Sequence, residues 1–294
     1  MFGTVHAISF LSATDKIPGG VESMATTPRV FTVTSGKGGV GKTNIAVNLA
    51  CQLAAAGQRV CLLDADFGLA NVDVLLGVTP PKDIFHLFQA RTKLQDVLFP
   101  TAYGFSILPA GSGFSRVTEL KTTERLELLH ALEPLADSLD YLIVDTAAGA
   151  GETVLYFNMA AQERLVVLCP EPTSLADAYA LVKTLKVTHG VDRFRVCVNM
   201  CQTEKQGKQI FAKLYDACDQ FLSGVSLDLA GIIPQDSVVR EAVMKQKPFG
   251  TLYPRAEASK AIAKLAQNVG KWPGARKAGG NIQFFWKSIL MRSR

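Results

Sequence analysis

The sequence lacks the features that mark several specialised classes of protein. None of its six cysteines forms a C-x-x-C pair with another, which argues against a disulfide scaffold and against an iron–sulfur carrier. No apolar run approaches the roughly 18 residues of a membrane-spanning helix, and no basic cluster precedes an apolar stretch as in an export signal. Only 19% of the 294 residues are charged and 48% are hydrophobic, so a disordered chain is excluded. We therefore expect a globular, cytoplasmic protein with reduced thiols.

Charge is distributed unevenly along the chain. The formal net charge is +5, but residues 245–294 contain 11 Lys or Arg residues and a single acid, Glu257. The first 244 residues are consequently net acidic. A basic partner-binding surface is therefore expected at the C-terminal end rather than over the whole molecule.

Short apolar runs alternate with helical patterns from Val30 onward. The runs that predict strands cover residues 30–34, 59–64, 105–109, 141–145, 164–169, 194–199 and 229–234. Their nearly continuous apolarity is typical of strands covered on both faces, as in a parallel sheet. Helical patterns lie between them, for example over residues 44–56, 119–136 and 174–188. The alternation predicts an α/β fold with a doubly wound, mostly parallel sheet.

Composition divides the chain into three parts. Residues 1–29 contain Gly, Pro, Ser and Thr without a strand or helix period, and we expect a flexible leader. Residues 30–272 hold all the predicted strands and form one domain. Residues 273–294 consist of a Gly-rich linker and a short basic segment.

The segment after the first predicted strand carries a phosphate-binding motif. Gly36, Lys37, Gly38, Gly39, Val40, Gly41, Lys42 and Thr43 match G-x-x-x-x-G-K-[ST], and Asn44 follows in the next predicted helix. The glycines let backbone N–H groups surround phosphate oxygens, and the helix N-terminus adds partial positive charge there. Lys42 is expected to contact the β- and γ-phosphates, and the Thr43 hydroxyl is expected to ligate Mg²⁺. The motif predicts a P-loop that binds a nucleoside triphosphate with Mg²⁺.

Two predicted strands end in acidic residues that suit this site. One strand ends at Asp145, and another ends at Asp64 with Asp66 two residues later. Because the C-terminal ends of parallel strands meet at one crevice, these carboxylates are expected beside the phosphates. We assign Asp145 to the water shell of Mg²⁺. A helix N-cap is the structural alternative for such an aspartate.

Lys37 has no obvious task in its own P-loop, since Lys42 already serves the phosphates. It is either a solvated lysine on an exposed turn or a residue that reaches the site of a second molecule. In the second case it would act like a trans arginine finger, a device worth ~10³ to 10⁵ in rate. The residues alone leave both interpretations open.

Longer segments resemble a known family. SGKGGVGKT, with its early Lys37, resembles the deviant Walker A motif of the MinD/ParA ATPases, as LLDADFGLANVDVLLG resembles the companion segment of the MinD branch. DTAAGAGETV, CPEPTSLADAYALVKTL, FRVCVNM and GIIPQDSVVREAVMKQKPF resemble the FlhG/FleN proteins, the MinD-like ATPases that limit flagellar number. The resemblance implies ATP with Mg²⁺, ATP-driven homodimerisation, slow hydrolysis, and a role in flagellar number and placement.

The resemblance also implies roles for individual residues. Lys37 would be the cross-dimer lysine, Asp66 would position the attacking water, and Asp64 would lie near the metal shell. Asn199 would hydrogen-bond adenine and Pro234 would line the purine pocket, while Glu171 is a further candidate for a nucleotide contact. Without the resemblance, Asn199 would be no more than a turn residue at a strand end.

The last segment predicts an amphipathic helix. At 100° per residue, its apolar stripe consists of Ile282, Phe285, Trp286, Ile289 and Leu290. A basic helix with aromatic residues suits an anionic membrane surface, and the family uses such a helix for membrane targeting. The alternative is that the stripe docks on the protein's own core. We expect docking without ATP and release with ATP, when two weak helices on one dimer gain avidity.

The family resemblance implies further partners and leaves two alternative functions. The partners are the FlhF-type GTPase, flagellar switch proteins and a flagellar transcription activator, with the protein peripheral to the inner face of the cell membrane. The leader lacks the D-Q-A-x-x-L-R helix of relatives that stimulate FlhF. A septum-placing MinD is the first alternative. A DNA-partitioning ParA is the second, but the aromatic stripe favours lipid over direct contact with nucleic acid.

Overall fold

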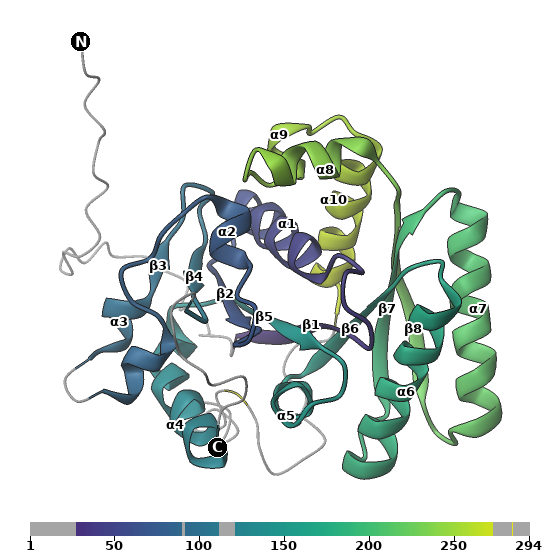
Figure 1. Cartoon of the computed structure of the whole chain (residues 1–294), viewed down its shortest axis with the longest axis horizontal. Coiled ribbons are helices and arrows are strands. Elements are labelled where there is room, and N and C mark those ends of the chain that lie inside the picture. Colours follow the sequence, from purple (N-terminus) through teal and green to yellow (C-terminus); the bar gives the residue numbers. More distant parts are fainter. Residues whose placement is uncertain (1–27, 90–91, 112–120, 273–283, 285–294) are drawn as a thin grey trace, which may run out of the picture.

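The computed structural model describes residues 28–89, 92–111, 121–272 and 284. Within these ranges the strands are β1 (Arg29–Ser35), β2 (Val60–Ala65), β3 (Phe99–Pro100), β4 (Ser106–Leu108), β5 (Tyr141–Ala148), β6 (Glu163–Leu168), β7 (Arg193–Cys201) and β8 (Ser226–Pro234). They form one sheet in the order β3-β4-β2-β5-β1-β6-β7-β8 (Figure 1). Neighbours are parallel, except for β3 and β4, which are antiparallel.

The seven predicted strands are all present, so the predicted fold class is confirmed. Every residue of β2 and of β6 is buried, as expected for strands that helices cover on both faces. No sequence pattern predicts β3, because two residues are too few to show an alternation. β1 lies between β5 and β6 in the middle of the sheet, which centres the loop that follows it.

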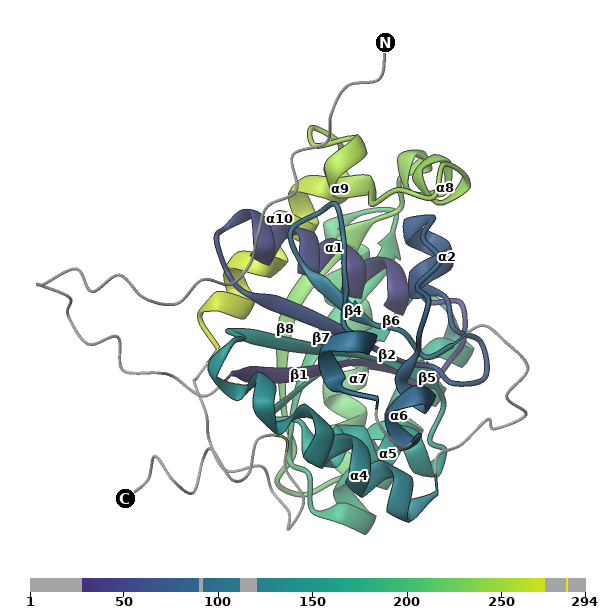
Figure 2. The same cartoon turned by 90° about the vertical axis from the view of Figure 1, so that its left-hand side faces the viewer.

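Helices cover both faces of the sheet, as Figures 1 and 2 show. One face carries α1 (Lys42–Ala55) and α10 (Glu257–Gly270), with α2 (Val72–Leu76), α8 (Ser237–Met244) and α9 (Phe249–Leu252) nearby. The other face carries α4 (Thr122–Leu132), α5 (Glu152–Ala160), α6 (Pro172–His189) and α7 (Glu204–Phe221). The short α3 (Leu94–Val97), η1 (Ile84–Phe88) and η2 (Glu133–Asp137) complete the described helices. The core consequently has two layers, one on each side of the sheet.

The predicted helices are present with different ends. α1 begins at Lys42, two residues before the predicted start, because the last residues of the P-loop already form its first turn. The helix predicted over 119–136 is shorter within the described residues, since α4 ends at Leu132 and the 3₁₀ turn η2 follows. Pro134 lies in the first turn of η2, where its missing N–H interrupts the α-helical hydrogen bonds.

All six cysteines are buried and free of disulfides, in agreement with the expected reduced thiols. Burial raises the pKa of Cys51 and of Cys61 to about 12. Such thiols remain protonated at neutral pH and react slowly.

The C-terminal part is described only at Phe284. This residue is fully buried, its ring stacks on Phe157 with centroids 6.1 Å apart, and its N–H donates to the Ala160 carbonyl at 3.1 Å. The predicted stripe residues Ile282, Phe285, Trp286, Ile289 and Leu290 lie outside the described residues, as does most of the leader. No helix within the described ranges has the length and apolarity to cross a membrane.

Candidate nucleotide-binding site

The phosphate-binding motif forms the loop between β1 and α1, at the C-terminal end of the central strand. Gly39 and Gly41 have φ angles of +79° and +93°, which side-chain-bearing residues rarely adopt. Gly41 caps α1 and, having no side chain, makes no side-chain cap to the first N–H groups of the helix. The open N–H groups of α1 therefore point toward the position that the motif assigns to phosphate.

Two glycines of the loop also permit close packing. A Cβ atom on Gly36 would overlap the Asp177 carbonyl of α6, and one on Gly41 would overlap the Asn199 side chain. Asn199, near the end of β7, donates from Nδ2 to the Val40 carbonyl at 2.8 Å. In this structure Asn199 thus holds the phosphate loop, while its predicted contact with adenine stays a prediction.

A cavity of about 790 Å³ opens over the P-loop. Its walls include Gly38, Gly39, Gly41, Lys42, Thr43 and Asn44 from the predicted motif, Asp66 after β2, and Ala147 and Ala148 at the end of β5. The remaining lining residues come from α2 and the loop before it, from Met200 of β7, and from the end of α8 with Gln246 after it. The structure therefore brings most of the motif and Asp66 to one cavity of a size that suits a nucleotide, whereas Gly36, Lys37 and Val40 do not line it.

Buried charges lie beneath the cavity. Lys42 is 8% exposed, and burial lowers its pKa while Asp145 and Asp66 oppose this shift. Burial raises the pKa of Asp145 to about 7, against the opposing effects of the Thr43 hydroxyl and Lys42. Among the described residues, Asp145 Oδ1 has no hydrogen-bond partner. A buried carboxylate oxygen without a donor is energetically costly, and a cation or its water shell would relieve that cost.

Asp64 supports the neighbouring loop. It lies beside Asp145 in the parallel pairing of β2 with β5. Its Oδ1 accepts from the Asp66 N–H at 3.0 Å, and its Oδ2 accepts from the N–H groups of Asn71 at 3.1 Å and Val72 at 3.2 Å. Burial and the charge of Asp145 raise its pKa well above the usual range, and these three N–H groups counteract the shift. Asp64 therefore fixes the loop that carries Asp66.

Asp66 is the more accessible of the two carboxylates. It is partly exposed in the wall of the P-loop cavity, and its Oδ1 accepts from the Leu69 N–H at 3.1 Å. One carboxylate oxygen is thus used to shape the loop. The accessible position agrees with the predicted role toward a water molecule in the cavity, which itself stays a prediction.

Lys37 contacts residues of its own chain. Its ammonium forms an ion pair with Glu171 and lies 2.9 Å from the Thr173 hydroxyl oxygen, both at the N-terminus of α6. Hydrogen bonding to Glu171 raises the pKa of Lys37, and the same contact lowers the pKa of Glu171. The sequence did not predict this pairing, because the two segments are 134 residues apart in the chain.

The rim of the cavity is apolar. Leu69, Val74 and Met244 are 73%, 54% and 78% exposed, and Met200 and Val243 complete the group. Met200 has a positive φ of 58°, a strained conformation for a residue with a side chain. Exposed apolar residues gathered around one cavity are typical of an interaction surface. The sequence did not identify this rim, whose residues come from four separate segments.

Pro234 lies apart from the other predicted nucleotide residues. It pairs with Cys201 at the end of β8 and lines a neighbouring groove instead of the P-loop cavity. Its predicted place in a purine pocket stays a prediction.

Known proteins match this chain in sequence and fold. Residues 31–249 match the family described as the CobQ/CobB/MinD/ParA nucleotide binding domain. The chain is 48% identical over 262 residues to the antiactivator FleN of Pseudomonas aeruginosa, covering 89% of this chain and 93% of that protein. It is 33% identical over 238 residues to the flagellum site-determining protein YlxH of Helicobacter pylori, covering 81% and 80%. A chain of the Aquifex aeolicus MinC:MinD cell division protein complex has a TM-score of 0.68 at 26% identity, covering 85% of this chain and 99% of that chain.

Proposed function

We propose that this chain regulates flagellar number and placement. It belongs to the CobQ/CobB/MinD/ParA family, as a MinD/ParA-type ATPase of the FlhG/FleN kind. The protein would dimerise when it binds ATP and return to the monomer after slow hydrolysis. The observation that carries the proposal is the 48% identity to an antiactivator FleN over 89% of the chain, combined with a complete P-loop that includes Lys37.

The residues around the P-loop support ATP as the ligand, with Mg²⁺. Thr43 and Asp145 would hold the metal, Asp145 through its water shell, and Lys42 would contact the phosphates. Bound Mg²⁺ would neutralise charge on the phosphate oxygens. Asp66 would orient a water molecule for attack, on a loop that Asp64 keeps in place. Asn199 would hold the P-loop against β7 while it contacts adenine.

Two features support an ATP-dependent homodimer. The apolar rim of Leu69, Val74, Met200, Val243 and Met244 surrounds the opening of the cavity, where a second copy would cover it. Among the described residues, the Lys37 side chain makes an ion pair with Glu171 and a hydrogen bond to Thr173, and both side chains of the ion pair are partly exposed. Exposed ion pairs contribute little to stability, so Lys37 can exchange these contacts for a nucleotide across the dimer.

The finer biological role follows from the family. The proposed partners are the FlhF-type GTPase, flagellar switch proteins and a flagellar transcription activator. The protein would act in the cytoplasm and at the inner face of the cell membrane, through the predicted stripe that contains Phe285 and Trp286.

The dimer is tested with purified full-length protein in sedimentation velocity runs. With ATP and Mg²⁺, Asp66→Ala should accumulate as a dimer because hydrolysis is blocked, while the wild type should return to the monomer as ATP is consumed. Lys42→Ala should remain a monomer in all conditions and bind no fluorescent ATP analogue. An Asp66→Ala protein that binds ATP yet stays monomeric would contradict the assignment.

The cellular role is tested by deleting the gene in its host and counting flagella and minicells by electron microscopy. Extra or misplaced flagella with normal division are expected, and complementation with the wild type but not with Lys42→Ala should restore the normal number. Minicells with normal flagella would instead indicate a septum-placing function.

A further inference from the structure

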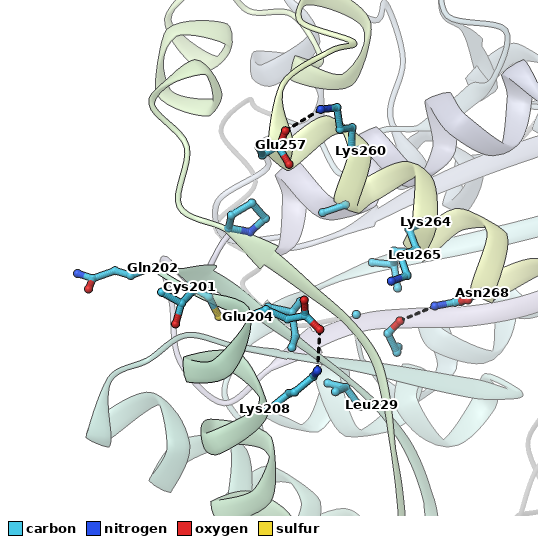
Figure 3. Close-up of a pocket in the computed structure, with 16 residues that line it drawn as sticks. Cys201, Gln202, Glu204, Lys208, Leu229, Glu257, Lys260, Lys264, Leu265 and Asn268 are labelled. Carbon is cyan, nitrogen blue, oxygen red and sulfur yellow. Dashed lines mark hydrogen bonds and ion pairs between the residues drawn. The ribbon is translucent and has the colours of Figure 1, made fainter.

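A second cavity lies along β8, which is the last strand of the sheet (Figure 3). This groove, called the β8 groove below, has a volume of about 510 Å³ and runs between the N-terminal part of α7 and the exposed side of α10. The P-loop cavity shares none of its lining residues. The lining residues include Pro234, the last residue of β8, and extend back along the strand to Leu229, which Figure 3 labels.

The floor of the β8 groove is apolar. Leu229 and Ile232 come from β8, and Ala261 and Leu265 come from α10. Leu229, Ile232 and Ala261 are only partly buried, so apolar surface remains open to the groove. A Cβ atom on Gly231 would lie 3.3 Å from Leu265, so the absence of a side chain there keeps the floor low. A concave apolar floor of this size can take several apolar side chains of a ligand.

One main-chain acceptor of β8 is already occupied by a side chain of α10. Asn268 of α10 donates from Nδ2 to the Ala230 carbonyl at 3.0 Å, so this main-chain acceptor is already used. A peptide that extended the sheet would have to displace Asn268. Edge strands are commonly guarded in this manner, and a ligand of the β8 groove is expected to make contact through side chains.

The walls of the groove carry charged side chains. Two acid–base pairs form among the described residues, and one lysine has no acidic partner there. Glu204 pairs with Lys208 within α7 at 2.8 Å, and Glu257 pairs with Lys260 within α10 at 2.6 Å. Lys264 is exposed between these pairs and forms no ion pair with any described residue. The pKa of Glu204 is lowered first by Lys208 and also by the charge of Lys264, which places Lys264 within electrostatic reach of the opposite wall.

We propose that the β8 groove docks an amphipathic helix of a partner protein, with apolar residues on the floor and an acidic residue beside Lys264. A helix fits because two helices form the walls and because Asn268 already occupies the Ala230 carbonyl at the edge of β8. An acidic partner fits because Lys264 is unpaired among the described residues, and residues 245–272 contain six Lys or Arg and one acid. Nucleic acid would supply negative charge but no apolar side chains for the floor. This docking is separate from the proposed nucleotide function and requires no ATP.

The test uses random 16-residue peptides displayed on their mRNA and selected on immobilised full-length protein without nucleotide. Recovered peptides should carry apolar residues at helical spacing and at least one acid on the same side. Their binding, measured by fluorescence anisotropy, should weaken at least tenfold with Lys264→Glu and with Ala261→Trp, which fills the floor. Lys264→Arg should retain binding, and Lys183→Glu, an equal charge change on α6, should leave it unchanged.

Each other outcome would overturn the proposal. Selected peptides that bind Lys264→Glu as tightly as the wild type occupy another surface. A selection that yields no peptide, combined with Lys264-dependent binding of a fluorescent fatty acid, would identify a site for a small carboxylate. Thermal melts and binding of a fluorescent ATP analogue establish that each variant is folded. Should Ala261→Trp not fold, Lys264→Glu and Lys183→Glu still decide the question.

Discussion

At the level of single residues, Lys37 contacts side chains of its own chain, and it would have to release them to reach the nucleotide of a second molecule. Glu171 and Thr173 lie at the start of α6, and Gly36 packs on the same helix one turn later, at Asp177. The lysine and the base of the P-loop therefore share one support. Freeing Lys37 costs only the weak contacts with Glu171 and Thr173.

Glu171→Gln tests this balance. The variant loses the ion pair with Lys37, so the ATP-dependent dimer should form a few-fold more tightly, because a surface ion pair is a weak contact. The dimer dissociation constant, measured in an Asp66→Ala background by sedimentation equilibrium, gives the answer. Glu204→Gln removes an exposed pair on α7 and serves as the control. A weaker dimer with lost ATP binding would instead assign Glu171 to the nucleotide.

Asp64 and Asp66 should separate stability from hydrolysis. Asp64→Ala leaves three backbone N–H groups without their acceptor, two of them near the start of α2, and should lower the free energy of unfolding by about 2–4 kcal/mol. Asp66→Ala removes one hydrogen bond at the cavity wall and should cost about 1 kcal/mol while abolishing ATP turnover. Urea denaturation and phosphate release measure the two effects. Equal destabilisation by both substitutions would refute this division.

The sequence predicted the positions of the motif residues better than the long-range contacts that hold them in place. Lys42 and Thr43 stand in a fixed local pattern, so their place at the cavity follows from eight consecutive residues. The loop-holding role of Asp64 and the contact of Lys37 with Glu171 depend on how distant segments meet. No local sequence pattern predicts contacts between distant segments. From the sequence alone, Asp64 is equally consistent with a metal ligand and with a helix cap.

At the level of elements, α5 joins the nucleotide site to the C-terminal part of the chain. It begins at Glu152, after the loop of Gly149 and Gly151 that follows β5, the strand that contains Asp145. At its other end the Arg164 guanidinium donates to the carbonyls of Asn158 and Ala161, each at 2.6 Å, and Phe284 takes the carbonyl of Ala160. Burial lowers the pKa of Arg164 to about 10, yet the group stays charged at neutral pH. A shift of α5 along its axis would therefore reach Phe284.

Phe284→Ala tests whether this contact restrains the C-terminal segment. Loss of the buried ring and its stacking on Phe157 should lower the free energy of unfolding by roughly 2–4 kcal/mol. The nucleotide-free variant should also float with anionic liposomes several-fold more than the nucleotide-free wild type. Phe221→Ala, at an exposed phenylalanine of α7, is the control. Equal flotation of Phe284→Ala and wild type without ATP would show that Phe284 does not restrain the C-terminal segment.

Elements were predictable in proportion to their length. The long apolar runs gave seven strands, because burial on both faces leaves a signal in consecutive residues. The two-residue β3 and the five-residue α2 are too short for a period, and their conformations depend on neighbours. The edge position of β8, which creates the β8 groove, follows from strand order, which the runs do not specify.

At the level of the whole molecule, two adjacent carboxylates are buried in the middle of the sheet. Asp145 has a pKa of about 7 in the folded chain against an ordinary value of 3.8, and the pKa of Asp64 is also raised. The folded protein therefore binds more protons than the unfolded chain in this range. The contribution of Asp145 to the free energy of unfolding is fully present below about pH 4. It is lost as the pH rises through about 7.

The nucleotide-free, metal-free protein should consequently unfold more easily in urea at pH 7.5 than at pH 5.5, by an amount of the order of 1–3 kcal/mol. Asp145→Asn cannot ionise at this position and should show a smaller difference between the two pH values. Saturating Mg²⁺ and ATP should stabilise the wild type more at pH 7.5, where Asp145 is ionised. A variant with an unchanged pH dependence would assign the effect to other groups.

The pairing of β1 with β5 also has a consequence for synthesis on the ribosome. Arg29 pairs with Tyr141 and Val33 with Asp145, so the central strand emerges 112 residues before one of its two neighbours, and Glu163 of the other comes later still. At a synthesis rate of 5–20 residues per second, roughly 6 to 20 s pass before β5 is made, and β1 lacks this neighbouring strand during that time. The phosphate loop is made early and becomes a site only late. Nascent chains of this protein should therefore be clients of ribosome-associated chaperones until β5 and β6 have been translated.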